Sequence, residues 1–179
     1  MSIISKEAVD HLFTEARSHN AWQPKEIPDE MLHKLYELMK FAPTSANCSP
    51  LRIVFVKTPE AKAKLKPFMS AGNVEKTMQA PVTAILAFDM DFASHLPQLF
   101  PHVDARPWFA GTDVAVRTVA LRNSTIQAGF FIAAARAIGL DTGPMSGFDE
   151  AGVNSAFFAG TRVEANFLVS LGFGDSSQM

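Results

Sequence analysis

The stretch of residues 41–50, FAPTSANCSP, carries more hydrogen-bonding side chains than a connection between a helix and a strand requires. Thr44, Ser45 and Asn47 can each donate and accept hydrogen bonds. One interpretation is a helix stop, in which Pro43 ends the preceding helix and the short polar side chains cap the turn. The other is a loop that contacts a ligand through alternating donors and acceptors.

A second cluster, ARSHN, lies at the end of the first predicted helix. Arg17 there could be an ordinary cation that faces the negative end of the helix dipole. Alternatively, its guanidinium group together with donors from Ser18, His19 and Asn20 would suit a phosphate group. The residues alone leave both interpretations open.

Two further clusters have a residue spacing that would suit contact with a ligand. Asn73 and Lys76 are three residues apart, so on a helical turn they share a face and could be a surface pair or address one ligand. The stretch GLDTGPMSGFD at 139–149 contains three glycines and a proline, which would let a backbone run flat against a ligand. It could equally be a connector between two helices.

Several familiar sites are missing from the sequence. It contains no G-x-G-x-x-G after a strand, no Walker motif and no G-x-S-x-G elbow, so a Rossmann site for NAD and a serine hydrolase are disfavoured. The single cysteine excludes an internal disulfide and fits a reducing cytoplasm, and the histidines are too scattered for a zinc pattern.

Length and composition fit one domain with a full core. The chain has 179 residues, of which 47% are hydrophobic, and its net charge is −2. No long basic run occurs, which argues against nucleic acid or a membrane surface as partner. The most apolar long segment, 114–140, contains three arginines and is therefore not expected to span a membrane. The N-terminus is not a secretory signal, since Lys6, Glu7 and Asp10 interrupt its apolar run.

Helices and strands are expected to alternate irregularly around these clusters. Periodicity and capping residues predict helices at 5–18, after Pro28, from Thr58, at 112–138 and at 149–160. Strands are predicted at 51–56, 81–88 and 164–174, a packed irregular excursion at 89–111, and a loop at 141–148. The result is an α+β or α/β layered domain.

The helix at 112–138 is apolar around most of its circumference. Gly139 is the expected C′ residue that ends it. A helix that is apolar nearly all round is expected to be buried, and one this long could cross a dimer interface.

Taken together and in this order, the four clusters resemble the FMN-dependent nitroreductase superfamily over nearly the whole chain. The motifs PTSANCSP, FPHVDARPWF, GLDTGPMSGFD and FFAGT…NFLVSLGFGDSS are similar to the malonic semialdehyde reductase subgroup of uracil (pyrimidine) degradation. The resemblance implies an α+β fold with a central, mostly antiparallel sheet flanked by helices and a long buried helix at a homodimer interface. It treats residues 1–179 as a single FMN-binding domain.

The resemblance also implies roles for particular residues. The phosphate of FMN would be held by Arg17, Ser18 and His19. The flavin of the other subunit would lie against Pro43, Thr44, Ser45 and Asn47. Asn73 and Lys76 would face the flavin, where the lysine stabilises negative charge at N1 and O2. A backbone amide of the last cluster would address flavin N5, in the segment Pro144, Met145, Ser146 and Gly147.

Two departures from the family pattern are visible. Members often carry a second basic residue one turn after Arg17, where this chain has Ala21 or Trp22. The family usually continues past its last long strand with a segment that embraces the partner subunit, and this sequence is expected to lack that extension.

The implied activity is a ping-pong hydride transfer in which NADH or NADPH reduces FMN, leaves, and is replaced by a small oxidised substrate. The subgroup resemblance points to reduction of malonic semialdehyde to 3-hydroxypropionate. The alternatives are a broad-specificity nitro or quinone reductase and, in another class, a non-catalytic flavin-binding dimer. No side chain is assigned as catalytic, since the flavin would perform the chemistry and Lys76 would tune it. No metal is expected.

Overall fold

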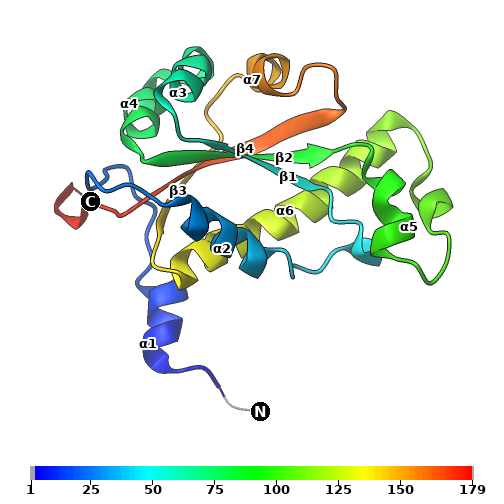
Figure 1. Ribbon diagram of the computed structural model, residues 1–179, viewed down its shortest axis with the longest axis horizontal. Helices are drawn as coiled ribbons and strands as arrows, with labels where there is room; N and C mark the ends of the chain where they lie inside the picture. The colour runs from blue at the N-terminus through cyan, green and yellow to red at the C-terminus, as the bar shows by residue number, and fades with distance from the viewer. Residues whose placement is uncertain (1–2, 179) are drawn as a thin grey trace.

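Four antiparallel strands form the sheet at the centre of the molecule, in the order β1–β2–β4–β3 (Figure 1). The structure is a computed structural model that describes residues 3–178. The strands are β1 Leu51–Val56, β2 Val82–Asp89, β3 Asp141–Met145 and β4 Val163–Gly172. The sequence prediction of an α+β domain with a mostly antiparallel sheet is confirmed.

The sheet is covered by helices on both faces. Figure 1 shows α2 and α6 on one face and α3, α4 and α7 on the other. Every residue of β2 is buried. Its side chains alternate between two cores, because Ala84 and Leu86 pack with the α2–α6 layer whereas Ile85 and Ala87 pack on the opposite side. The continuous apolar run of this strand is therefore explained by helices on both faces.

The helices at 29–39, 59–65, 113–137 and 150–157 lie close to their predicted positions, whereas the helix at 71–79 falls where the sequence suggested only a helical turn. Their bounds are α1 Lys6–Val9, α2 Asp29–Met39, α3 Pro59–Leu65, α4 Ala71–Gln79, α5 Leu96–Leu99, α6 Asp113–Ala137 and α7 Glu150–Phe157. The hydroxyls of Thr58 and Thr112 accept hydrogen bonds from the N–H groups of Ala61 and Ala115, as N-caps do. Gly139, at φ 83°, follows the end of α6 in the left-handed conformation that glycine allows.

The predicted loop at 141–148 is wrong in its first half. Asp141–Met145 is the edge strand β3 and pairs with β4, Asp141 opposite Gly172 and Met145 opposite Leu168. No strand was predicted there because Gly143 and Pro144 are disfavoured in strands. An edge strand tolerates proline because the missing N–H can face away from the ladder, and β4 supplies the pairing that local propensity does not.

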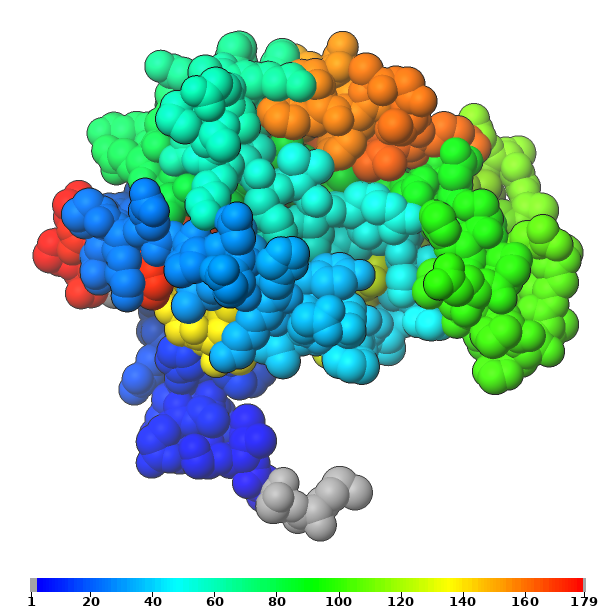
Figure 2. Space-filling view, in the orientation of Figure 1, coloured from blue at the N-terminus to red at the C-terminus, as the bar shows by residue number. Residues whose placement is uncertain are grey.

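The predicted helix at 5–18 is too long. It begins as α1 and continues as one π-helical turn, Asp10–Thr14, before the chain leaves it. Phe13 is 61% exposed, and Figure 2 shows this N-terminal part projecting from the body of the molecule. The chain leaves the helix because Ser18 and His19 pair with Thr142 instead.

The long helix α6 is buried on one face only, which corrects the prediction of a helix buried all round. Ile126 and Phe130 are 42% and 44% exposed, whereas Asn123, Ser124 and Gln127 are buried. The polar residues turn inward because they bond to backbone groups there. Within residues 3–178, no helix is long and apolar enough to cross a membrane.

Candidate functional site

Three of the four predicted clusters meet along the edge strand β3. Ser18 forms a parallel bridge with Thr142, and the His19 N–H donates to the Thr142 carbonyl at 3.0 Å. Lys76 of α4 reaches the same segment, since its Nζ donates to Asn20 Oδ1 at 3.2 Å. We call this region, made of Arg17–Asn20, Asn73, Lys76 and Thr142–Gly147, the β3 corner.

The glycine–proline segment is fixed in the β3 corner by α4. Asn73 Nδ2 and the Ser70 N–H both donate to the carbonyl of Gly147, at 2.9 and 3.1 Å. A Cβ on Gly147 would lie 2.5 Å from Asn73 Nδ2, and one on Gly143 would lie 2.4 Å from the His19 carbonyl oxygen. The backbone contact therefore requires glycine at 143, whereas a side chain at 147 would displace the Asn73 amide. The Asn73 amide is already engaged, whereas Pro144 and Ser146 remain exposed.

Two cationic groups of the β3 corner remain accessible. Arg17 is exposed, and its Nη1 donates to the carbonyls of Thr14 and Ala16 at 2.9 and 2.8 Å, which leaves its other guanidinium N–H groups available. Ser18 is exposed beside it, and Lys76 is half-buried. A guanidinium, an ammonium and a hydroxyl gathered in this way suit an anionic ligand.

His19 is placed differently from Arg17. Only 8% of it is exposed, and its Nε2 lies 3.5 Å from Asp141 Oδ1. The ring packs so closely on Gly174 that a Cβ there would lie 1.9 Å from Nδ1. Among residues 3–178, this Nδ1 and the hydroxyl of Thr142 are the buried side-chain atoms without a hydrogen-bond partner. His19 is thus turned into the protein, and the structure separates it from the exposed pair Arg17 and Ser18.

The fourth cluster, with Pro43, Thr44, Ser45 and Asn47, lies at the opposite end of the sheet. It precedes Leu51, the first residue of β1. Leu51 pairs with Phe88 of β2, and Phe88 pairs on its other side with Glu164 of β4. Thr142 of the β3 corner pairs instead with Leu171 of the same strand. Seven residues along a strand correspond to roughly 23 Å, and β1 and β3 are opposite edges of the sheet. One chain therefore does not bring the fourth cluster to the Ser18–Thr142 pairing.

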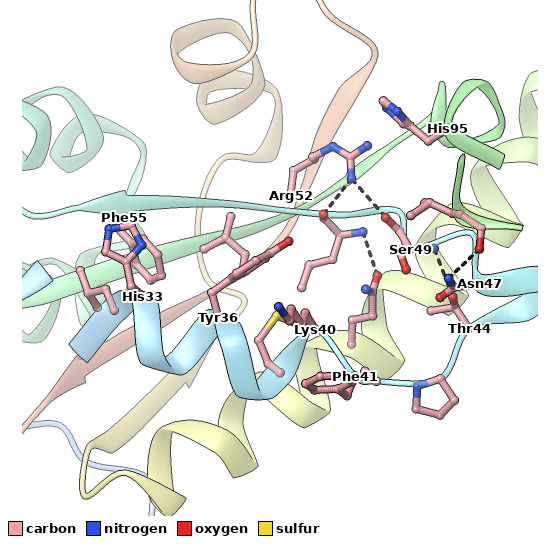
Figure 3. Close-up of a pocket in the computed structure, with 18 of the residues that line it drawn as sticks. His33, Tyr36, Lys40, Phe41, Thr44, Asn47, Ser49, Arg52, Phe55 and His95 are labelled. Carbon is pink, nitrogen blue, oxygen red and sulfur yellow. Dashed lines mark hydrogen bonds between the residues drawn. The ribbon is translucent and has the colours of Figure 1, made fainter. Parts of the chain in front are cut away.

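Two of the polar side chains in this loop hold the loop itself. The hydroxyl of Thr44 accepts a hydrogen bond from the Ser49 N–H at 3.1 Å, and Asn47 Nδ2 donates to the Leu99 carbonyl at 2.8 Å (Figure 3). Pro43 and Ser45 are exposed. The capping interpretation of the sequence therefore accounts for Thr44 only, because Asn47 bonds a distant carbonyl. A ligand contact remains open for the exposed residues Pro43, Ser45 and Asn47.

A cavity of about 1100 Å3 lies along the edge strand β1, between α2 and α5 (Figure 3). Of the predicted site residues, it is lined only by Pro43, Thr44 and Asn47; other lining residues include Tyr36, Lys40, Arg52, Phe55 and His95. Arg52 donates to the Asp89 carboxylate at 2.6 Å and to the Ser49 carbonyl at 3.1 Å. Sequence reasoning missed this cavity, and the arginine within an otherwise apolar strand was its one visible signal.

The comparisons with known proteins agree with this architecture. A protein of Burkholderia lata named "putative NADH dehydrogenase/NAD(P)H nitroreductase" is 61% identical over 98% of this chain and 90% of its own. A putative nitroreductase of Bacillus subtilis superposes with a TM-score of 0.85 at 22% identity, covering 98% of this chain and 92% of that chain. One from Exiguobacterium sibiricum, solved in complex with FMN, gives 0.85 at 19% identity, covering 99% and 92%. These structural likenesses confirm the nitroreductase fold. The family model described as "Nitroreductase family" matches residues 14–174, so the chain belongs to the nitroreductase family.

Proposed function

We propose that this protein reduces a small semialdehyde, malonic semialdehyde to 3-hydroxypropionate, at FMN sites shared by two subunits. As a member of the nitroreductase family, the protein is an FMN-dependent oxidoreductase that uses NAD(P)H. The semialdehyde is supported by the subgroup resemblance of FPHVDARPWF and GLDTGPMSGFD. We also propose a cytoplasmic location, on the ground of the single reduced cysteine.

The observation that carries the cofactor site is the convergence of three distant segments at the β3 corner. Arg17 and Ser18 offer exposed donors for a phosphate, and Lys76 offers an ammonium group. The buried Thr142 hydroxyl lacks a partner in the same corner, within the part of the chain described. This donor set fits FMN. When bound, FMN supplies the chemistry by accepting a hydride from NAD(P)H and passing it to the substrate.

The residues of the β3 corner would have separate roles in holding FMN. Arg17 and Ser18 hold the phosphate, and His19 anchors their segment through Asp141 instead of binding the ligand directly. Lys76 provides positive charge where the reduced ring carries negative charge. A backbone amide in Pro144–Gly147 faces N5, in a segment that Asn73 fixes through the Gly147 carbonyl.

A homodimer reconciles the two ends of the sheet. Because the loop with Pro43 and Ser45 is far from the β3 corner of its own chain, we propose that it lies against the flavin bound by the partner. The exposed Ile126 and Phe130 of α6 provide apolar surface for such an interface. The cavity beside β1 adjoins this loop.

The substrate is tested by kinetics with FMN-loaded enzyme. We expect kcat/KM for malonic semialdehyde to exceed the values for nitroaromatics and quinones, with NADH and NADPH compared as reductants. The name of the Burkholderia lata relative favours the second candidate, a broad nitro or quinone reductase, which the opposite order of kcat/KM would establish. Bound flavin that NAD(P)H does not reduce would contradict both activities.

A further inference from the structure

The buried polar face of α6 holds the loop that precedes β1. Asn123 and Gln127 are four residues apart, so they lie on one side of the helix, and they are only 3% and 4% exposed. Burying an amide side chain is costly unless it is hydrogen-bonded. The Ser45 N–H donates to Asn123 Oδ1 and the Leu51 N–H donates to Gln127 Oε1, both at 2.9 Å.

These two hydrogen bonds bracket a strained segment. Between them, Ala46, Asn47 and Ser49 have φ values of 47°, 51° and 38°, in the left-handed region that favours glycine. Residues other than glycine adopt such conformations at a cost, and they persist only where the surroundings fix them firmly. A loop that only connected α2 to β1 could place glycine at these positions without strain.

The interior of the segment is fixed as well. The Thr44 hydroxyl accepts a hydrogen bond from the Ser49 N–H, and Asn47 donates one to the carbonyl of Leu99, the last residue of α5. Cys48 is 1% exposed in the same segment, so the loop packs against the core. The result is a rigid loop whose exposed residues include Ser45 and Pro43.

We infer that Asn123 and Gln127 are positioning residues for the flavin, which hold residues 45–51 in a strained conformation and thereby set Ser45 against the partner's cofactor. The inference rests on the proposed function, since it takes this loop as a wall of the FMN site. Because both side chains are buried, we expect neither to touch the flavin. They act by presenting a loop that is already ordered, so that binding does not have to order it.

Removal of both anchors tests this inference. The double variant Asn123→Leu/Gln127→Met keeps apolar bulk but leaves the Ser45 and Leu51 N–H groups without acceptors. Ser124→Ala is the matched control, because Ser124 is equally buried on α6 but its hydroxyl donates only to the Leu121 carbonyl of the same helix. Gln127→Glu keeps an acceptor oxygen for Leu51 and serves as the rescue of Gln127→Met.

Two readouts separate positioning from folding. The first is FMN affinity of the apoprotein, followed by flavin fluorescence and the visible spectrum. The second is alkylation of Cys48, the only cysteine of the chain, which reports opening of this loop, while thermal unfolding monitors the fold. We expect the double variant to bind FMN at least about fivefold more weakly and to alkylate about tenfold faster, as loss of buried hydrogen bonds implies. Ser124→Ala should match the wild type, and Gln127→Glu should restore both values.

The outcomes distinguish this inference from the function on which it rests. Wild-type protein that binds no FMN would overturn the proposed function, and this inference with it. Tight wild-type binding with unchanged affinity in the double variant, despite faster alkylation, would overturn the inference alone. If the double variant does not fold, Gln127→Met against Gln127→Glu makes the same comparison, and equal affinities would contradict positioning.

Discussion

The two ends of the sheet differ in how the backbone packs closely and in which side chains stay accessible. At the β3 corner, tight approaches are made by Gly143 and Gly147, and the cations Arg17 and Lys76 are left accessible. At the 45–51 loop, three left-handed residues are not glycine, and the polar side chains bond within the chain. The first region offers charge to a ligand, whereas the second offers a rigid surface.

Under the proposed function, the two regions would serve one site in different ways. Charge-assisted hydrogen bonds from accessible side chains give affinity for an anion. A locked backbone gives shape, because its entropy has been lost before the ligand arrives. Since the two regions lie at opposite ends of the sheet, the proposed homodimer would bring them together.

The shared site predicts an all-or-none result in mixed dimers. A heterodimer of an Arg17→Ala subunit and a Ser45→Trp subunit, purified through two different tags, should contain one site with neither change and one with both. We expect one tight FMN per heterodimer at a concentration where both parent homodimers bind poorly. A heterodimer without a tight site would show that Arg17 and Ser45 of the same chain serve the same flavin.

The locked loop predicts an unreactive cysteine. Burial raises the pKa of the Cys48 thiol from about 9.0 to about 11. A pKa raised by about two units lowers the thiolate fraction at pH 8 about a hundredfold. Alkylation of the folded protein should therefore be at least that much slower than alkylation in denaturant. The rate should keep rising with pH beyond 9, because the raised pKa delays ionisation. A plateau near pH 9 would indicate that the loop is open.

The accessible corner predicts discrimination between phosphorylated and unphosphorylated flavin. A charge-assisted hydrogen bond contributes about 1.5–3 kcal/mol, so Arg17→Ala should weaken FMN about ten- to a hundredfold and riboflavin far less. Isothermal titration with both ligands measures this. Lys34→Ala removes an exposed cation of α2 as a control. Equal weakening of FMN and riboflavin binding would show that Arg17 does not contact the phosphate.

Lys76 predicts a smaller effect, on the reduction potential. An ammonium near N1 and O2 stabilises reduced anionic flavin more than oxidised flavin, so Lys76→Met should lower the midpoint potential. An interaction of about 1.4–2.8 kcal/mol corresponds to about 30–60 mV for this two-electron couple. Binding of oxidised FMN should change only a few-fold. An unchanged potential in a redox titration would leave Lys76 as the surface partner of Asn20.

Much of the fold was predictable because its signals are local. The Thr58 and Thr112 caps, Gly139, and the apolar runs of β1, β2 and β4 each act within a few residues, and the structure has these elements close to the predicted positions. The strand β3 was not predictable in this way. Its glycine and proline disfavour a strand, and only pairing with β4 makes one.

The residues of the candidate site divide along the same line. By itself, the sequence determined which side chains could hold an anionic cofactor, because a guanidinium or ammonium group keeps its chemistry in any fold. Only the tertiary structure decided which of them are available. In the folded chain, His19 is buried against Asp141 and Gly174. The side chains of Asn73 and Thr44 are occupied by hydrogen bonds to the Gly147 carbonyl and the Ser49 N–H. The tertiary structure also turned the polar face of α6 inward, where Asn123 and Gln127 supply the N–H groups of Ser45 and Leu51 with acceptors that no neighbour in the sequence supplies.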